Sequence, residues 1–403
     1  FTVDDALEEG GVDKMAAAAE REGKDPWEVA SFYIAAFHQD LETLGYRRAD
    51  AYPRATENIP EMIRLTEELI RKRHAYVSPE GQVYFDISTF EAYGRLSGNT
   101  LENLEAGARV EVEADKRHPH DFALWKKDEK HVMQWDSPWG RGFPGWHLEC
   151  SAMAMRFLGE SIDIHTGGED NLFPHHECEI AQSEGATGEP FASIWMHPRH
   201  LLVEGEKMSK SLGNVHTIPD LVARGYSGTA IRYALVSTQY RQPQNFTWDS
   251  LDAAARAVDR LNEFVRKLEG AEGVEDRAEV AEAVERSERE FVEAMDDDLN
   301  VSGGLASVFE LMTAVNRVGR PLSVRDEKLV RDRMEAIDDV FGFLEREPET
   351  TYGDEADIQQ LVDQRSKARA NGDFRMADQI RDALRARGIL IEDGASGTRW
   401  RRA

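Results

Sequence analysis

Two lysines three positions apart, Lys207 and Lys210, lie in the segment KMSKSLGN, where they alternate with hydroxyl side chains and precede a glycine. They are the only lysines between Lys130 and Lys267, in a chain with 12 lysines and 37 arginines. A mobile loop with two ammonium groups can approach a triphosphate and stabilise the charge that builds on a leaving pyrophosphate. Taken alone, a solvated basic turn explains the segment equally well.

A second group of residues has the side chains of a metal site. Cys150 precedes the run HHECE at 175–179. On one helix His175 and Glu179 would face the same side, and Cys150 would come from another element, so three ligand types that zinc accepts could meet. Cys178 points about 100° away from Glu179 on such a helix, and we interpret it as structural. Histidines that cap a helix, with Cys150 in the core, would give the same spacing.

A third segment, TGGED at 166–170, follows a strand expected at 162–165. Gly167 and Gly168 would let the backbone approach a ligand closely, and the Asp170 carboxylate can accept hydrogen bonds from ribose hydroxyls. A plain turn has the same composition.

Periodicity and capping residues predict the elements that must position these groups. The sequence DPWE at 25–28 combines an N-cap, a proline and an N3 glutamate, so it predicts the start of a helix that continues to Leu44. A second helix is expected from Asn58, and a hairpin over 74–88. Short strands are expected at 162–164 and 201–203. Further helices are predicted at 221–237, 251–268, 278–295, 304–318 and 329–344, and a final hairpin at 388–400 around Asp393 and Gly394.

Composition narrows the class of protein. At roughly 150 residues per domain, 403 residues make two to three domains. The hydrophobic content of 41% excludes disordered and collagen-like chains. Two cysteines make no disulfide framework, which favours a reducing compartment. Because no apolar run reaches the 18 to 20 residues of a membrane span and the first residues lack signal-peptide features, we expect a cytoplasmic protein without a membrane partner.

The charge of the chain is −27, from 49 basic and 76 acidic residues. An acidic surface that is poor in lysine is typical of proteins that work in molar salt, because carboxylates retain water and lysine stems expose apolar area. We interpret the composition as halophilic, with an ordinary acidic cytosolic protein as the alternative.

The charge is not uniform along the chain. Residues 365–402 contain ten basic and five acidic side chains, a net charge of +5, so the rest of the chain carries −32. This basic segment, with Phe374 and Trp400 as stacking partners, indicates contact with a polyanion, while a solvated amphipathic helix would carry the same charge.

Four sequence motifs follow one another along the chain: GWHLECSAM at 145–153, FPHHE at 173–177, WMH at 195–197 and KMSKS at 207–211. Together they resemble the cysteinyl-tRNA synthetases, which are class I aminoacyl-tRNA ligases, and the similarity continues to GTRWRR at 397–402. KMSKS indicates only the class, whereas GWHLEC and FPHHE specify the cysteine enzymes. The chain is therefore identified as a member of this family.

The resemblance implies zinc (Zn²⁺) bound by Cys150, His175 and Glu179 together with a cysteine from an earlier strand. A substrate thiolate bonds zinc at about 2.3 Å, whereas the serine hydroxyl is a harder and far less acidic donor. Cysteine would therefore be selected at binding, without an editing domain.

The resemblance also implies the reaction. The cysteine carboxylate attacks the α-phosphate of ATP, with Mg²⁺, and the cysteinyl group then moves from the adenylate to the cysteine tRNA. Trp146 would line the amino-acid pocket, with a core tryptophan as the alternative. The residues implied for the nucleotide are Gly167, Gly168 and Asp170 at the ribose and Lys207 and Lys210 at the phosphates. The anticodon contacts implied are Arg369, Phe374, Asp378 and Arg381, with a plain helix surface as the alternative.

The implied fold is an α/β Rossmann-like class I catalytic core with an inserted domain, an α-helical bundle and a small α+β C-terminal domain. We expect a monomer. The expected parts are a core at 1–54 and 135–216, an insertion at 55–134, a stem-contact region at 217–250, a bundle at 251–345 and an anticodon-binding domain at 346–403.

The sequence departs from the family in one region. It has no His-x-Gly-His signature and no cysteine before Cys150. We interpret this as a truncation, with a degenerate paralogue as the alternative, and expect the chain as given to bind ATP poorly and to activate cysteine slowly. Other readings are a tRNA-binding fragment and a cysteine ligase for an amino sugar, which the basic segment after Asp354 disfavours. A zinc hydrolase with Glu177 as its base would leave KMSKS unexplained.

Overall fold

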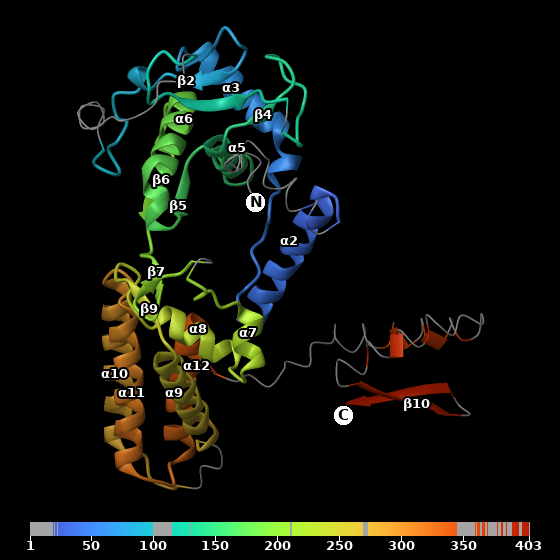
Figure 1. The fold of residues 1–403 in the computed structure, drawn as a ribbon. Helices are drawn as coiled ribbons and strands as arrows, with labels where there is room; N and C mark the ends of the chain where they lie inside the picture. Colours follow the sequence, from blue (N-terminus) through green and yellow to red (C-terminus); the bar gives the residue numbers. More distant parts are fainter. Residues whose placement is uncertain are drawn as a thin grey trace. The chain divides into compact units, whose positions relative to one another are not determined.

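The structure is a computed structural model, and Figure 1 draws its two compact units, Phe1–Phe343 and Leu344–Ala403. In the first unit it describes residues 19, 21, 23–99, 115–129, 131–209, 212–268 and 273–343. In the second unit it describes residue 344, single helical residues between 359 and 384, and the strands at 389–394 and 397–402.

The first two predicted helices are confirmed. α2 spans Pro26–Thr43, and the Asp25 carboxylate accepts hydrogen bonds from the backbone N–H groups of Trp27 at 2.8 Å and Glu28 at 3.0 Å. The Glu28 carboxylate accepts the Asp25 N–H in return at 3.1 Å, which completes the capping box. α3 spans Ile59–Arg71 and begins directly after Asn58.

A four-stranded antiparallel sheet follows α3. Its strands β1 (Ala75–Val77), β2 (Val83–Phe85), β3 (Phe122–Lys126) and β4 (Phe143–Pro144) are neighbours in that order. β1 and β2 form the predicted hairpin, with Ala75 opposite Phe85. Apolar side chains of this sheet and of α3, α5 and α6 make one core. Its largest fully buried members are Trp125, Phe85, Met62, Leu69, Ile87, Leu124 and Leu148.

The α/β part of the first unit has a parallel strand pair beside two helices, as Figure 1 shows. β5 (Ile162–Thr166) pairs in parallel with β6 (Ala192–Met196). α5 (Trp146–Leu158) precedes β5, and α6 (Glu177–Thr187) lies between the two strands in sequence. The predicted strand at 162–164 is therefore confirmed.

The predicted strand at 201–203 is also confirmed, as β7 (Leu201–Val203) of a small mixed sheet in the order β8-β7-β9. β7 pairs antiparallel with β8 (Glu206–Lys207) and parallel with β9 (Gln244–Phe246). The short β7–β8 hairpin leads directly into KMSKS.

The single helix predicted at 221–237 is wrong, because two helices occupy this stretch. α7 (Ile218–Ala223) ends before Gly225, whose φ of 97° no helix accommodates. α8 (Gly228–Val236) has its own N-cap, Ser227, whose hydroxyl accepts the Ala230 N–H at 3.1 Å.

The predicted bundle is present in Figure 1 as helices that run alongside one another. They are α9 (Trp248–Arg266), α10 (Ala278–Asp296), α11 (Val301–Val318) and α12 (Val324–Phe341). The predicted apolar stripes are buried between them, as at Val280, Phe291, Leu305, Val308, Leu311, Val315, Val330 and Met334. Among the residues described, no helix combines the length and the apolar character that crossing a membrane requires.

The second unit contains the predicted terminal hairpin, formed by β10 (Ile389–Gly394) and β11 (Gly397–Arg402). Pairing extends to Gly394 opposite Gly397, so Asp393 and Gly394 lie in a strand and not in the turn. Trp400, which the sequence offers as a stacking partner for bases, is half-buried, and its stacking role stays a prediction. Its ring packs on the small core of Val362, Ile380 and Leu384, and its indole N–H donates to the Gln359 side chain at 3.1 Å.

Candidate active site

The start of α5 consists of Gly145, Trp146 and His147, the first residues of the GWHLEC string. Its N-cap, Gly145, has no space for a side chain, because a Cβ there would lie 2.0 Å from the Ala123 carbonyl oxygen. The two next residues, Trp146 and His147, are half-buried. The ring centroids of Trp146 and His175 are 4.4 Å apart, and the Nδ1 atoms of His147 and His175 are 2.8 Å apart.

The three predicted metal ligands lie together. One donor atom each from Cys150, His175 and Glu179 lies within 4.8 Å of the others. Glu179 is fully buried, and neither of its carboxylate oxygens accepts a hydrogen bond. A buried carboxylate without such partners is costly unless a positive charge compensates it. A thiol, an imidazole and a carboxylate are the donor set that zinc accepts, so these residues fit the metal.

The sequence suggested that His175 and Glu179 lie on one regular helix, but the structure places them in two consecutive elements. α6 begins at Glu177, and His175 belongs to the preceding turn, Leu172–His176, where Phe173 has non-helical backbone angles. His175 Nε2 nevertheless lies 3.8 Å from Glu179 Oε2. Cys178 belongs to neither group of potential ligands found in the described part of the chain. Its sulfur lies 3.5 Å from the Tyr93 hydroxyl.

Two further histidines approach Glu179, and the sequence analysis missed both. Their Nε2 atoms lie 3.1 Å (His165) and 3.8 Å (His176) from Glu179 Oε2, and the three residues form a second group of potential ligands. His176 Nδ1 also lies 2.8 Å from Nε2 of His197, which belongs to the WMH string. The density of histidine around TGGED and WMH was the available signal.

Burial controls the protonation of this cluster. It lowers the pKa of His147 and of His176 to about 3, and neighbouring histidines lower both further. It raises the pKa of the Cys150 thiol to about 12, with the charge of Glu179 adding to the effect. The imidazoles of His147 and His176 are therefore neutral, and that of His176 is able to act as a ligand, while the Cys150 thiol needs a cation beside it to ionise.

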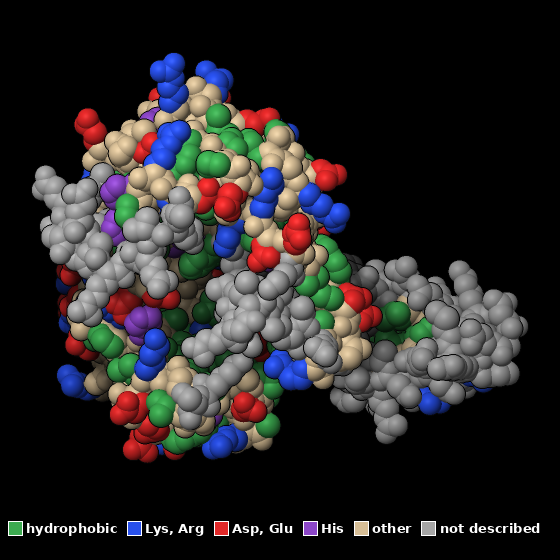
Figure 2. Space-filling model, turned by 45° about the horizontal axis from the view of Figure 1, so that its top comes forward, with side chains coloured by type: hydrophobic (Ala, Val, Ile, Leu, Met, Phe, Trp, Pro, Cys, Tyr) green, Lys and Arg blue, Asp and Glu red, His purple; other side chains and the backbone are tan. Residues whose placement is uncertain are grey.

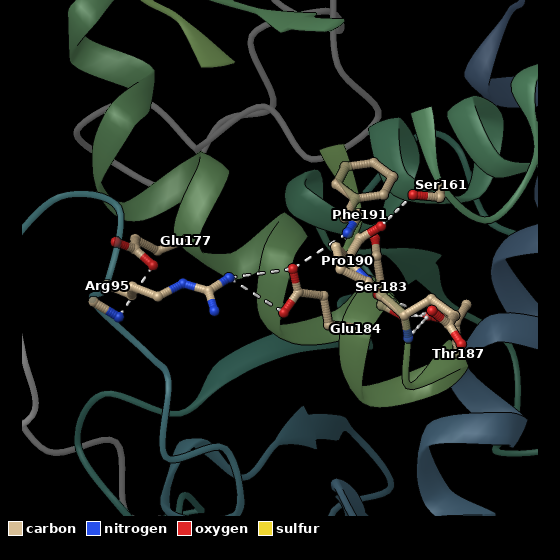
Figure 3. A network of polar contacts seen from close by, with 10 residues as sticks. Arg95, Ser161, Glu177, Ser183, Glu184, Thr187, Pro190 and Phe191 are labelled. Carbon is tan, nitrogen blue, oxygen red and sulfur yellow. Dashed lines mark hydrogen bonds and ion pairs between the residues drawn. The ribbon is translucent and has the colours of Figure 1, made fainter. Parts of the chain in front are cut away.

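Figure 3 shows how α6 is attached to the turn at 94–97. The buried Glu177 carboxylate accepts the backbone N–H groups of Gly94 at 3.0 Å and Ser97 at 2.6 Å. About two turns further along α6, the Glu184 carboxylate accepts a hydrogen bond from the Arg95 guanidinium at 3.4 Å. Because backbone donors occupy both oxygens of Glu177, this carboxylate is not placed to activate water, which counts against the hydrolase reading.

The TGGED loop is tightly built. A Cβ at Gly167 would lie 2.6 Å from the His176 ring, and one at Gly168 would lie 2.5 Å from Oδ1 of Asp170, whose side chain is exposed. The loop is held by Glu169, which the sequence analysis did not single out. Its carboxylate accepts the Arg199 guanidinium at 2.6 Å and the backbone N–H of His200 at 2.9 Å.

The structure describes only part of the predicted phosphate loop. Lys207 ends β8 and is exposed, while Lys210 lies outside the described residues. The Asn214 side chain accepts the Ser209 N–H at 2.8 Å and donates to the Lys207 carbonyl at 3.2 Å, so it bridges both ends of the KMS sequence.

The predicted anticodon contacts belong to the second unit. Arg369 and Arg381 are helical and exposed. Phe374 and Asp378 lie outside the described residues, so their roles stay predictions.

The chain matches known protein families over most of its length. Three family models match: "tRNA synthetases class I (C) catalytic domain" over residues 11–256, "DALR domain" over 290–345 and "Cysteinyl-tRNA ligase anticodon binding domain" over 354–401. The solved structure of Mycobacterium tuberculosis methionyl-tRNA synthetase in complex with methionyl-adenylate is similar, with a TM-score of 0.57. At 14% identity over 82% of this chain and 80% of that one, it shows a shared fold.

Similar relatives named cysteine–tRNA ligase come from several organisms. That of Symbiobacterium thermophilum is 45% identical over 97% of this chain and 85% of its own length. The relative from Carboxydothermus hydrogenoformans is 42% identical over the same shares, and that from Salinibacter ruber is 40% identical over 100% of this chain and 84% of its own. With these matches over nearly its whole length and a catalytic-domain model over most of it, the chain belongs to the cysteinyl-tRNA synthetase family of class I aminoacyl-tRNA synthetases.

Proposed function

We propose that this protein joins L-cysteine to its tRNA at the expense of ATP, through cysteinyl-adenylate. The observation that carries the proposal is the buried Glu179 carboxylate, which accepts no hydrogen bond and lies beside the Cys150 thiol and the His175 imidazole. Family membership supports the reaction, and this donor set supports the amino acid, because a thiol-selective metal needs soft and borderline ligands.

The first step forms a mixed anhydride. An oxygen of the cysteine carboxylate bonds to the α-phosphorus of ATP, and the bond from that phosphorus to the pyrophosphate breaks. We assign the ribose to Asp170, whose side chain is exposed and follows the two glycines of the tightly built loop. Lys207 and Lys210 would stabilise charge on the leaving pyrophosphate, with Mg²⁺ bound to ATP.

Amino-acid selection would rest on the metal group. When bound by Cys150, His175 and Glu179, zinc would supply a Lewis acid that prefers a thiolate to a hydroxyl. The His147 ring lies against His175 at 2.8 Å and fixes its orientation, and the half-buried Trp146 ring flanks the same imidazole. These contacts would hold the ligands in place before substrate arrives.

The second step moves the cysteinyl group to a ribose hydroxyl at the end of the tRNA, and AMP leaves. We assign anticodon contact to the second unit, at Arg369, Phe374, Asp378 and Arg381. The exposed arginines Arg369 and Arg381 and the net charge of +5 in this segment support that assignment. The same features disfavour an amino-sugar ligase, which needs no anticodon module.

Pyrophosphate exchange on the full-length protein tests the proposal. We expect exchange of labelled pyrophosphate into ATP that depends on cysteine and that serine does not support. Charging of a transcript of the cysteine tRNA should follow. A full-length protein that binds tRNA but gives no cysteine-dependent exchange would support the reading as a catalytically impaired paralogue instead.

A further inference from the structure

We propose that Asp298, in the turn between α10 and α11 of the bundle, is a positioning residue for the nucleotide loop at 167–170. It would act through the segment 239–241 and through Arg199. The inference rests on the proposed function, because it assigns the nucleotide to that loop.

Three consecutive side chains converge on the Asp298 carboxylate. The Tyr240 hydroxyl donates at 2.6 Å, the Gln239 amide at 3.3 Å, and the Arg241 guanidinium donates through Nε and, at 3.3 Å, through Nη2. Single exposed ion pairs contribute little, but a carboxylate with three donors from one segment fixes that segment in one geometry.

The backbone at this turn is strained in a way that the contacts explain. Asp298 and Leu299 have φ values of 53° and 54°, in the left-handed region that side-chain-bearing residues rarely adopt. The turn is tied at both ends. Leu299 N–H donates to the Met295 carbonyl at 3.2 Å, and the Asn300 side chain caps α11 by accepting the Gly303 N–H at 3.0 Å. This backbone conformation points the Asp298 carboxylate toward the segment 239–241. Strained residues of this kind are common at functional sites.

The second half of the connection runs from Tyr240 to the nucleotide loop. The Tyr240 carbonyl accepts the Arg199 N–H at 2.9 Å, and the Arg199 guanidinium donates to Glu169 at 2.6 Å. Glu169 also receives the His200 N–H, and its own N–H donates to the Pro198 carbonyl at 3.0 Å.

Glu169 lies between Gly168 and Asp170, the residues assigned to the ribose. An unbroken series of hydrogen bonds therefore joins Asp298 to this loop. Since a small displacement of a binding group costs much of its effect, loosening the series should weaken ATP binding more than cysteine binding.

Two neighbouring aspartates give a matched test. Asp298→Asn keeps the size of the side chain and its tolerance of a left-handed backbone, but it removes the charge and points an amide N–H₂ at the donors. Asp297→Asn makes the same change one residue earlier, at an exposed side chain. In the full-length protein we expect Asp298→Asn to raise the Kd of ATP about fivefold, with cysteine KM unchanged, and Asp297→Asn to leave both at wild-type values.

A double-substitution cycle separates positioning from general loosening. Tyr240→Phe removes the hydroxyl alone, and the double variant should bind ATP no more weakly than Asp298→Asn by itself, because both changes break one connection. Equal ATP affinities in Asp298→Asn and Asp297→Asn, or fully additive losses in the double variant, would overturn the inference. Lack of cysteine-dependent exchange in the wild-type protein would instead refute the proposed function, and the Kd of ATP reads the connection independently of it.

Discussion

Glu179 is the central residue of the candidate metal site. Two sets of potential ligands share it, Cys150 with His175 and His165 with His176. Its oxygens are buried and accept no hydrogen bond, although four donors or ligands surround them. A carboxylate held in this way destabilises the metal-free fold and stabilises the fold that holds a cation.

Replacement of Glu179 by glutamine should therefore have opposite effects in the two states. In the metal-free protein, the neutral amide removes an uncompensated buried charge, and we expect the free energy of unfolding to rise by about 1–3 kcal/mol. With zinc present, loss of a ligand should lower it. Urea unfolding with chelator and with zinc measures both. A loss of stability of the same size in the two conditions would contradict the role of Glu179 as a ligand.

The buried histidine rings give the metal-free protein a defined response to acid. Burial lowers the pKa of His147 from its ordinary value of 6.5 to about 3. Between these values the unfolded chain binds a proton that the folded chain does not, so stability is complete above pH 6.5 and falls as the pH drops toward 3. We expect His147→Asn to reduce the slope of unfolding free energy against pH by about 1.4 kcal/mol per unit. An unchanged slope between pH 6 and 4 would refute this.

At the scale of elements, α6 depends on the turn at 94–97 that Glu177 anchors (Figure 3). Glu177→Gln retains one acceptor but turns an N–H₂ group toward a backbone N–H, so a buried donor loses its partner. We expect a loss of about 2 kcal/mol in unfolding free energy. Glu189→Gln, at an exposed position just after α6, is the control and should cost nothing measurable. Equal stability of the two variants in urea would show that the anchor contributes little.

Elements with strong local signals could be predicted from the sequence. The capping box at Asp25, the β1–β2 hairpin and the bundle helices follow from side chains close in the chain, so they appear where expected. The break between α7 and α8 was missed, because one glycine with a positive φ, Gly225, gives little signal inside an apolar period.

The site was predictable only in part for a related reason. Cys150, His175 and Glu179 stood out as metal-ligand types, and the structure brings them together. Glu169 and Glu177 were not recognised as anchors, because their partners are backbone N–H groups distant in sequence. No spacing rule reports such contacts. The packing of Trp400 on a small core was not predicted either, because it depends on residues that are distant in the chain.

At the scale of the whole molecule, the charge of −27 predicts that stability depends on salt. Figure 2 shows acidic side chains spread over one face of the molecule among arginine and lysine. If the composition reflects adaptation to salt, the protein should gain stability steadily as KCl rises to molar concentration, because screening weakens the repulsion. Unfolding temperatures across a KCl series measure this. Full stability in dilute buffer would leave an ordinary acidic protein as the explanation.

Because the chain forms two compact units, we expect tRNA binding by the second unit to be separable from cysteine activation by the first. Phe374→Ala changes only the second unit, so it should weaken binding of the cysteine tRNA by roughly 1–3 kcal/mol if the ring stacks on a base. Cysteine-dependent pyrophosphate exchange, which needs no tRNA, should be unchanged. Filter binding and exchange on one preparation give both values. An equal loss in the two assays would reject the assignment.

The central claim is that a metal held by Cys150, His175 and Glu179 distinguishes sulfur from oxygen in the incoming amino acid. Cobalt in place of zinc makes this visible, because a thiolate bonded to Co²⁺ gives an intense charge-transfer absorption and a hydroxyl does not. Titration of the cobalt-loaded full-length protein with cysteine should increase that absorption to saturation, and serine should leave it unchanged. Saturable binding of cysteine without any change in the cobalt spectrum would contradict the account.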